Sequence, residues 1–268
     1  MIELAEKLNL DVTLVKKLKK LSDEKDKRVE RVAENCVKNG FSCLDAESDI
    51  MRLAVILKCA EKLKEKYDYY GISEDIYYDT LSDIKIWCDK NNNKGLLNYR
   101  WIKNHVSFQL FRLGRLQFQF YECKNKTLFY NKLPFEYGEK LIYIHVPEGE
   151  KLQKEKCIDS IRCANEFFKK YFPDYNYRFY FCESWLLFDG NRNFMPDSSN
   201  IMQFASLFEH AYSINFDKQA IERIFGKRRW FIKNYPEKTS LQKRTKQYLK
   251  EKGTLGLGVG TIDKSTVV

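Results

Sequence analysis

Several patterns that often reveal a function are missing from this sequence of 268 residues. The eight cysteines include no C-x-x-C pair, and only three histidines are present, so the close ligand pairs of a zinc site are absent. We therefore expect no metal cofactor. We interpret the cysteines as reduced thiols that act mostly as small core residues.

Long apolar runs are also missing. The longest aliphatic run covers only residues 53–57, whereas a membrane span needs roughly 20 apolar residues. The first ten residues are already charged and amphipathic, which is not typical of a signal peptide. The sequence therefore predicts a cytoplasmic protein with no membrane partner. Hydrophobic residues make up 44% and aromatic residues 15%, which excludes a wholly disordered chain.

The positive charge is concentrated in one part of the chain. The formal net charge is +10, but residues 1–98 contain 18 basic and 19 acidic residues. Residues 99–268 contain 29 basic and 18 acidic residues, and 12 basic and 4 acidic residues fall within 214–252 alone. A local excess of this kind indicates an anionic partner, such as nucleic acid, anionic lipid or a phosphate-bearing small molecule.

The first hundred residues show the apolar spacing of helices. Helical periodicity begins near Leu4 and returns over residues 46–67, and Ser73 is a suitable N-cap for a helix that reaches Trp87. A fourth helix is predicted over residues 99–113. Part of that stretch, residues 106–110, also alternates like a strand, and periodicity does not decide between the two interpretations.

After Arg115 the apolar period changes to two. We expect strands at 116–120, 127–130, 141–146 and 177–187, a helix over 153–172 between the last two, further helices at 201–212 and 240–252, and a strand at 255–262. The sequence therefore predicts an α+β protein. A helical N-terminal domain, residues 1–114, would be followed by a domain with a mostly antiparallel central sheet, residues 115–268.

Four segments occur in order in the second part: LFRLGRLQF at 110–118, IHVPEG at 144–149, FCESWLL at 181–187 and SNI at 199–201. Together with LSDI at 81–84, they resemble a bacterial acyltransferase family with a helical N-terminal domain and a GNAT-like C-terminal domain. The resemblance covers about residues 45–262. The predicted order of strands and helices is also that of the GNAT fold.

The resemblance implies an enzyme that moves an acyl group to an amine or hydroxyl by direct attack. The donor would be acetyl-CoA or another acyl-CoA, and the acceptor a small molecule or a peptide. In GNAT enzymes the acyl-pantetheine arm enters between two diverging strands, here those at 141–146 and 177–187. Ser184 would lie beside the thioester.

The resemblance also implies a pyrophosphate site at the N-terminus of the 153–172 helix, where free backbone N–H groups attract anions. The residues placed there are Gly149, Glu150, Lys151, Leu152 and Gln153. The segment departs from the family pattern, because it has one glycine and two glutamates where phosphate oxygens should approach. Capping of the helix by those acids is the alternative interpretation.

Three residues are candidates for acid–base catalysis. His145 ends a predicted strand and has the side chain best suited to accept a proton near neutral pH, although a core histidine is the alternative. Glu148 follows it in the loop. Glu183 interrupts an otherwise apolar face, so burial could raise the pKa of its carboxyl group and make it a base. Pairing with Arg178 or Arg192 would instead make Glu183 structural.

Two other functions remain open from the sequence. Basic residues interleaved with aromatic ones at 227–231, with the basic helix after residue 240, would suit a nucleic-acid-binding module, although no recognised nucleic-acid motif is present. A GNAT-like scaffold that binds a ligand without turnover is the other alternative.

The glycines at 256, 258 and 260 follow a helix, so they predict a strand with close backbone neighbours and not a nucleotide-binding loop. The oligomeric state leaves no mark in the sequence.

Overall fold

The computed structural model describes residues 1–124 and 133–267, which form two compact units. The first unit contains Met1–Leu113 together with Gln117–Gln119 and Val146–Gly149. The second contains Gly114–Leu116, Phe120–His145 and Glu150–Val268. The strand predicted at 127–130 lies outside the described residues.

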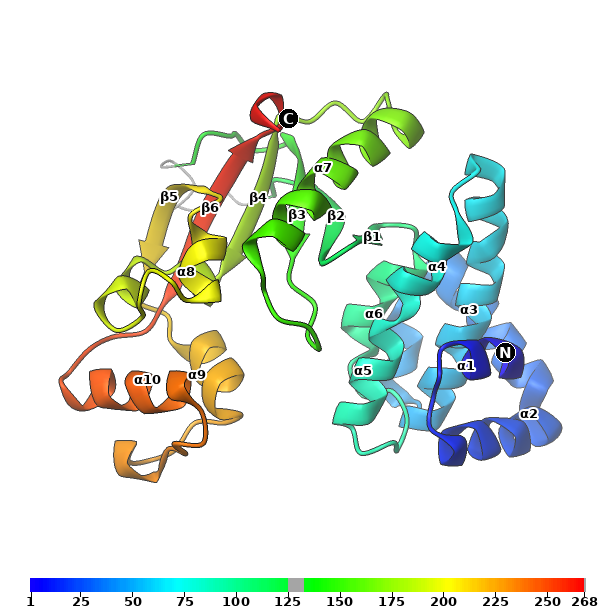
Figure 1. Cartoon of the computed structure of the whole chain (residues 1–268). Helices are drawn as coiled ribbons and strands as arrows, with labels where there is room; N and C mark the ends of the chain where they lie inside the picture. Colours follow the sequence, from blue (N-terminus) through cyan, green and yellow to red (C-terminus); the bar gives the residue numbers. More distant parts are fainter. Residues whose placement is uncertain (125–132, 268) are drawn as a thin grey trace. The chain divides into compact units, whose positions relative to one another are not determined.

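The first unit is helical, as the sequence predicts (Figure 1). Its central helix is α3, Asp49–Tyr70, which begins at the N-cap Ser48 and ends at Gly71 in the left-handed conformation. The predicted 73–87 helix is broken at Ser82 into two helices. The helices around α3 are α1 (Ile2–Lys7), α2 (Val12–Asn39), α4 (Glu74–Leu81), α5 (Asp83–Lys90) and α6 (Tyr99–Val106), with a short 3-10 turn η1 (Phe41–Ala46).

The structure decides between the two interpretations of residues 99–113. Helix α6 ends at Val106, and Leu110–Leu113 forms the first strand, β1. The helical interpretation is therefore wrong beyond Val106. Phe108 lies between the two elements with a positive φ of 59°, which ends the helix because that backbone conformation cannot continue it.

In the described residues the sheet has six strands, in the order β1-β2-β3-β4-β6-β5. Strands β3 and β4 are parallel, and β6 is antiparallel to both β4 and β5. The fold class is therefore α+β with a mixed, mostly antiparallel sheet, as predicted. Besides β1, the strands are β2 (Leu116–Glu122), β3 (Lys140–His145), β4 (Phe179–Ser184), β5 (Glu209–Ile214) and β6 (Leu257–Asp263).

Two crossover connections place two helices on the same face of the sheet. The chain passes from β3 through α7 (Lys154–Tyr171) to β4, and then through α8 (Asn200–Ala205) to β5. Because β3, β4 and β5 run in the same direction and progress the same way across the sheet, right-handed crossovers put both helices on one side. Figure 1 shows α7 and α8 on that side. The carboxyl ends of these three strands therefore share one edge.

Two predicted elements need correction. The 201–212 helix is wrong beyond Ala205, because Glu209–Ile214 pairs with β6 as the edge strand β5. The 177–187 strand ends at Ser184 and continues as a 3-10 turn η3, Trp185–Leu187. The chain between β5 and β6 forms α9 (Lys218–Phe225), which the sequence analysis missed, and the predicted α10 (Ser240–Lys250).

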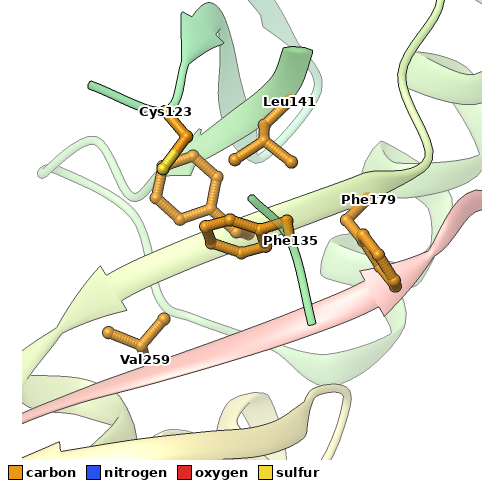
Figure 2. Packing of buried hydrophobic residues seen from close by; sticks show 6 residues of the cluster. Cys123, Phe135, Leu141, Phe179 and Val259 are labelled. Carbon is orange, nitrogen blue, oxygen red and sulfur yellow. The ribbon is translucent and has the colours of Figure 1, made fainter. Parts of the chain in front are cut away.

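One face of the sheet carries an aromatic core. Buried side chains from β3, β4, β6 and the segment before β3 pack there, and Figure 2 shows them gathered over β4 and β6. Tyr143 and Tyr212, both partly buried, pack against this cluster. Its buried members are Cys123, Phe135, Leu141, Phe179, Phe181 and Val259.

The glycines in β6 and directly before it confirm the predicted close approach of other backbone segments. A Cβ added to Gly258 would lie 2.0 Å from the carbonyl oxygen of Leu187. A Cβ at Gly256 would lie 2.1 Å from the carbonyl oxygen of Ile214. Only glycine allows these contacts, so the G-x-G-x-G segment is a packing feature. None of the helices in the described part of the chain is both long and apolar enough to cross a membrane.

Candidate functional site

Strands β3 and β4 pair over a short stretch and then separate. Their register joins Ile142 to Tyr180 and Tyr143 to Phe181, while β3 continues to His145 and β4 to Ser184. Across this opening, the Tyr143 hydroxyl donates a hydrogen bond of 3.2 Å to the backbone carbonyl of Glu183. A side chain therefore takes the place of a ladder hydrogen bond, as expected where two strands part.

The structure brings His145 and Glu183 to the same face beside this opening. Alternate residues on a strand share a face, so His145 lies with Tyr143 on β3 and Glu183 lies with Phe181 on β4. The His145 ring stacks on Tyr143 with centroids 4.1 Å apart, and Tyr143 lies 4.3 Å from Phe181. Two of the three predicted catalytic residues therefore lie on the same face of the sheet, next to aromatic side chains.

Glu183 has the electrostatic properties expected of a base. The residue is exposed, yet surrounding protein desolvates its carboxyl group and raises its pKa above the ordinary value. The expected pairing with Arg178 is wrong, because the Arg178 Nε lies 2.8 Å from Asp263. Arg192 lines a cavity beside β5.

Tyr212 lies on the same face as Glu183, two strands away. Both residues pair in register with Val259 of the intervening strand β6. Desolvation raises the pKa of Tyr212, and the negative charge of Glu183 raises it further. Tyr212 therefore keeps its proton at neutral pH and can donate it.

The N-terminus of α7 has the features of an anion site. Gln153 is the N-cap, and its side chain makes no capping hydrogen bond among the described residues. Glu150 lies 3.9 Å from Lys156 of the first turn, and Glu155 is the acid within that turn. The backbone N–H groups of the first turn can therefore donate hydrogen bonds to an anionic ligand.

Arg115 is a residue that the sequence analysis did not single out. It is only 4% exposed and donates hydrogen bonds to the carbonyls of Glu150 at 2.8 Å and Lys151 at 3.1 Å. Next to it, the Leu116 N–H donates to the Ser160 hydroxyl of α7 at 3.0 Å. These contacts join the predicted phosphate segment to Arg115, and the start of β2 to α7. Its place in the motif LFRLGRLQF is the signal that could have identified it.

The other predicted site residues have local partners. Glu148 and Gly149 belong to the first unit, where Glu148 forms an ion pair with Lys90 of α5. The Ser184 hydroxyl accepts a hydrogen bond of 3.2 Å from the Leu186 N–H and so caps η3. Leu152 is buried, and Lys151 is exposed.

A Ser–His–Asp cluster lies elsewhere, beside the cavity of about 460 Å³ on the face that carries α8. The His210 Nε2 lies 2.9 Å from the Ser213 hydroxyl and 3.2 Å from Asp189 Oδ2. A catalytic triad uses both ring nitrogens, one for each partner. Because both partners here share Nε2, the cluster is not a triad. No group of three ligands suited to a metal occurs within residues 1–124 and 133–267.

Comparison with protein families gives two consecutive matches. The GNAT-like C-terminal domain matches residues 110–262, and the N-acyltransferase N-terminal domain matches residues 1–108. No curated protein sequence matches this chain.

Solved structures of an acyltransferase share the fold. One, in complex with decanoyl-CoA and teicoplanin, has a TM-score of 0.78 and 18% identity, over 97% of this chain and 86% of that chain. Another, in complex with decanoyl-CoA, has a TM-score of 0.77 and 20% identity over the same shares. A mutant in complex with octanoyl-CoA has a TM-score of 0.78 and 19% identity, again over 97% and 86%.

The chain belongs to the family defined by the GNAT-like C-terminal domain, whose model matches more than half of it. With the N-acyltransferase domain in front, its class is that of an acyltransferase. The resemblance inferred from the sequence motifs is confirmed.

Proposed function

We propose that this acyltransferase takes its acyl group from a coenzyme A thioester and transfers it to an amine or hydroxyl of a small molecule or peptide. The observation that carries the proposal is the opening between β3 and β4, with Glu183 and His145 on one face beside it. The similar structures bind decanoyl-CoA, octanoyl-CoA and teicoplanin, which supports an acyl-CoA donor and a bulky acceptor. We retain the cytoplasm as the proposed location and residues 1–114 and 115–268 as the proposed domains.

The donor would bind along the edge where β3 and β4 end. Its pyrophosphate would meet the uncapped N–H groups of α7 and the segment Gly149, Glu150, Lys151, Leu152 and Gln153. Arg115 supports this position because its hydrogen bonds satisfy two backbone carbonyls of the segment. The thioester would then reach the opening between the strands, where Ser184 ends β4.

The reaction needs a base for the acceptor and an acid for the departing thiolate. The acceptor nitrogen or oxygen attacks the thioester carbonyl carbon while a base removes its proton, and the C–S bond then breaks. We assign the base to Glu183, whose raised pKa and exposure both suit it, with His145 as the second candidate and Glu148 as the third. Tyr212 or Ser184 would protonate the thiolate. The products are the acylated acceptor and free coenzyme A.

The test combines binding with turnover. We expect calorimetry to detect coenzyme A and acyl-CoA binding, and a thiol-release assay over an amine panel to detect turnover. Glu183→Gln should lower kcat by about 100-fold or more, because a general base contributes about 10²–10⁴-fold. His145→Gln should lower it by roughly tenfold if the imidazole orients or assists the base.

The matched control is Glu209→Gln. Glu209 is an exposed glutamate of β5 that pairs with Thr261, so it lies on the same face of the sheet but farther from the opening. Its replacement should leave kcat unchanged. Unchanged turnover in Glu183→Gln would reject the assignment of the base. The absence of any coenzyme A binding would reject the proposed donor.

A further inference from the structure

Residues 226–235, here called the apical loop, present apolar side chains to solvent between α9 and α10. Trp230 is 98% exposed, Phe231 63% and Ile232 38%. Three consecutive apolar residues with this exposure are unusual, because each leaves apolar area in contact with water. The proposed acyl transfer does not use them.

The base of the apical loop is held firmly. Tyr235 is buried and stacks on Phe225 at 4.3 Å. Lys246 of α10, only 7% exposed, donates hydrogen bonds to the carbonyls of Lys233 at 2.8 Å and Tyr235 at 2.7 Å. The exposure of Trp230 is therefore a property of a braced loop and not of a fraying end.

The charges of the loop form a pattern around its apolar tip. Lys227, Arg228 and Arg229 come before the tip and Lys233 comes after it, with no acidic residue between 226 and 235. Arg228 pairs with Asp217, while the structure gives Lys227 and Arg229 no ion pair within the described chain. Proteins that contact a membrane interface place apolar side chains near the acyl chains and lysine or arginine near the lipid phosphates. A tip of Trp, Phe and Ile with cations on both sides has the same arrangement.

We propose that the apical loop docks this protein on an anionic phospholipid surface. Trp230, Phe231 and Ile232 would enter the boundary between headgroups and acyl chains, and the flanking cations would contact lipid phosphates. The wider excess of basic residues over 214–252 adds to the attraction. The expectation of no membrane partner, which rested on the lack of a spanning segment, is thereby revised to surface contact. Nucleic acid is less well matched, because Ile232 offers no ring on which a base could stack.

The test is co-sedimentation of the full chain with vesicles of phosphatidylcholine, alone and mixed with phosphatidylserine. We expect binding to the mixed vesicles that weakens with salt. The double variant Trp230→Ala/Phe231→Ala should bind at least about tenfold more weakly, since both insertion groups are lost. Lys227→Gln/Arg229→Gln should reduce the preference for phosphatidylserine. These side chains are exposed, so the variants should fold normally.

Tyr69→Ala is the matched control, because Tyr69 is 85% exposed but lies on α3 of the first unit. It should bind vesicles like the unchanged protein. Equal binding by the unchanged protein and the Trp230→Ala/Phe231→Ala variant would overturn the proposal. A lack of vesicle binding by the unchanged protein would also overturn it. If single-stranded RNA binds instead, and the Trp230→Ala/Phe231→Ala variant abolishes that binding, the loop is a nucleic-acid site. Neither result would bear on acyl transfer, which is measured separately by thiol release.

Discussion

Each unit contains an acidic residue within one of the motifs that resemble the family. The surrounding protein shifts the pKa values of these two acids in opposite directions. In the first unit Asp83 is 3% exposed, and its Oδ2 lies 3.3 Å from His105 Nε2 and 2.9 Å from Trp101 Nε1. Burial alone would raise its pKa, but the hydrogen bond and charge of His105, with Trp101 and Gln117, lower it below its usual range. In the second unit, Glu183 is exposed and its pKa is raised by desolvation.

The difference separates an acid that is stabilised in its charged form from one whose charged form is disfavoured. A carboxylate surrounded by donors is stabilised in its charged form and binds a proton weakly. A desolvated carboxylate without such donors binds a proton more readily, which suits a base that must take one from an acceptor. The motif LSDI therefore contains a buried, hydrogen-bonded acid of the helical unit, and FCESWLL contains the exposed acid that we propose as the base.

The largest effect should come from removing the buried acid. Asp83→Ala should lower the free energy of unfolding by about 3–5 kcal/mol, because it removes the carboxylate that pairs with buried His105 and accepts a hydrogen bond from Trp101. Urea unfolding measures the change. Asp89→Ala is the control on the same helix, since its ion pair with Lys85 is exposed and should contribute less than about 1 kcal/mol. A loss for Asp83→Ala no larger than this would contradict the structural role.

An intermediate effect should follow the loss of Arg115 in the second unit. Arg115→Met should raise KM for the acyl donor by about tenfold with little change in kcat, because the loop before α7 loses its hydrogen-bonded support while the base is untouched. Steady-state kinetics with varied acyl-CoA provide the measurement. Lys169→Met, at the exposed far end of α7, should change neither constant. A lower melting temperature with an unchanged KM would show that Arg115 acts on stability alone.

The smallest effect should be the pH dependence of stability, in which the contributions of the two acids change in opposite directions as pH rises. Because the folded-state pKa of Asp83 is lowered, its charge stabilises the fold above the unfolded pKa of about 3.9, and this is lost as pH falls through the folded value. Asp83→Asn should therefore cost more at neutral pH than in acid.

The folded-state pKa of Glu183 is raised, so its favourable contribution is present below about pH 4.3 and is lost as pH rises through the folded value. Glu183→Gln should slightly raise the melting temperature at neutral pH and not in acid. Thermal unfolding between about pH 2 and 8 measures both variants, because the change expected for Asp83 lies below about pH 3.9. Shifts of the same sign for the two acids would break the comparison.

Local patterns predicted much of the fold. The helical first part, the strand at 141–146, the helix that follows it and the glycine-rich last strand all come from residues close together in sequence, so periodicity and capping were sufficient. The ordered motifs gave the family and placed His145 and Glu183 as candidates. The prediction failed at 201–212, where Phe208 and Tyr212 fit a helical spacing but β6 supplies a strand partner.

The sequence by itself determined the class of this protein: a helical part, an α+β part of the GNAT-like family, and a positive charge gathered in 214–252. Only the tertiary structure decided which residues share a surface. The divergence of β3 and β4, the hold of Arg115 on the loop before α7 and the exposure of Trp230 each depend on chain segments far apart in sequence. The electrostatics of Asp83 and Glu183 were decided there too, because desolvation and charge act through space and not along the chain.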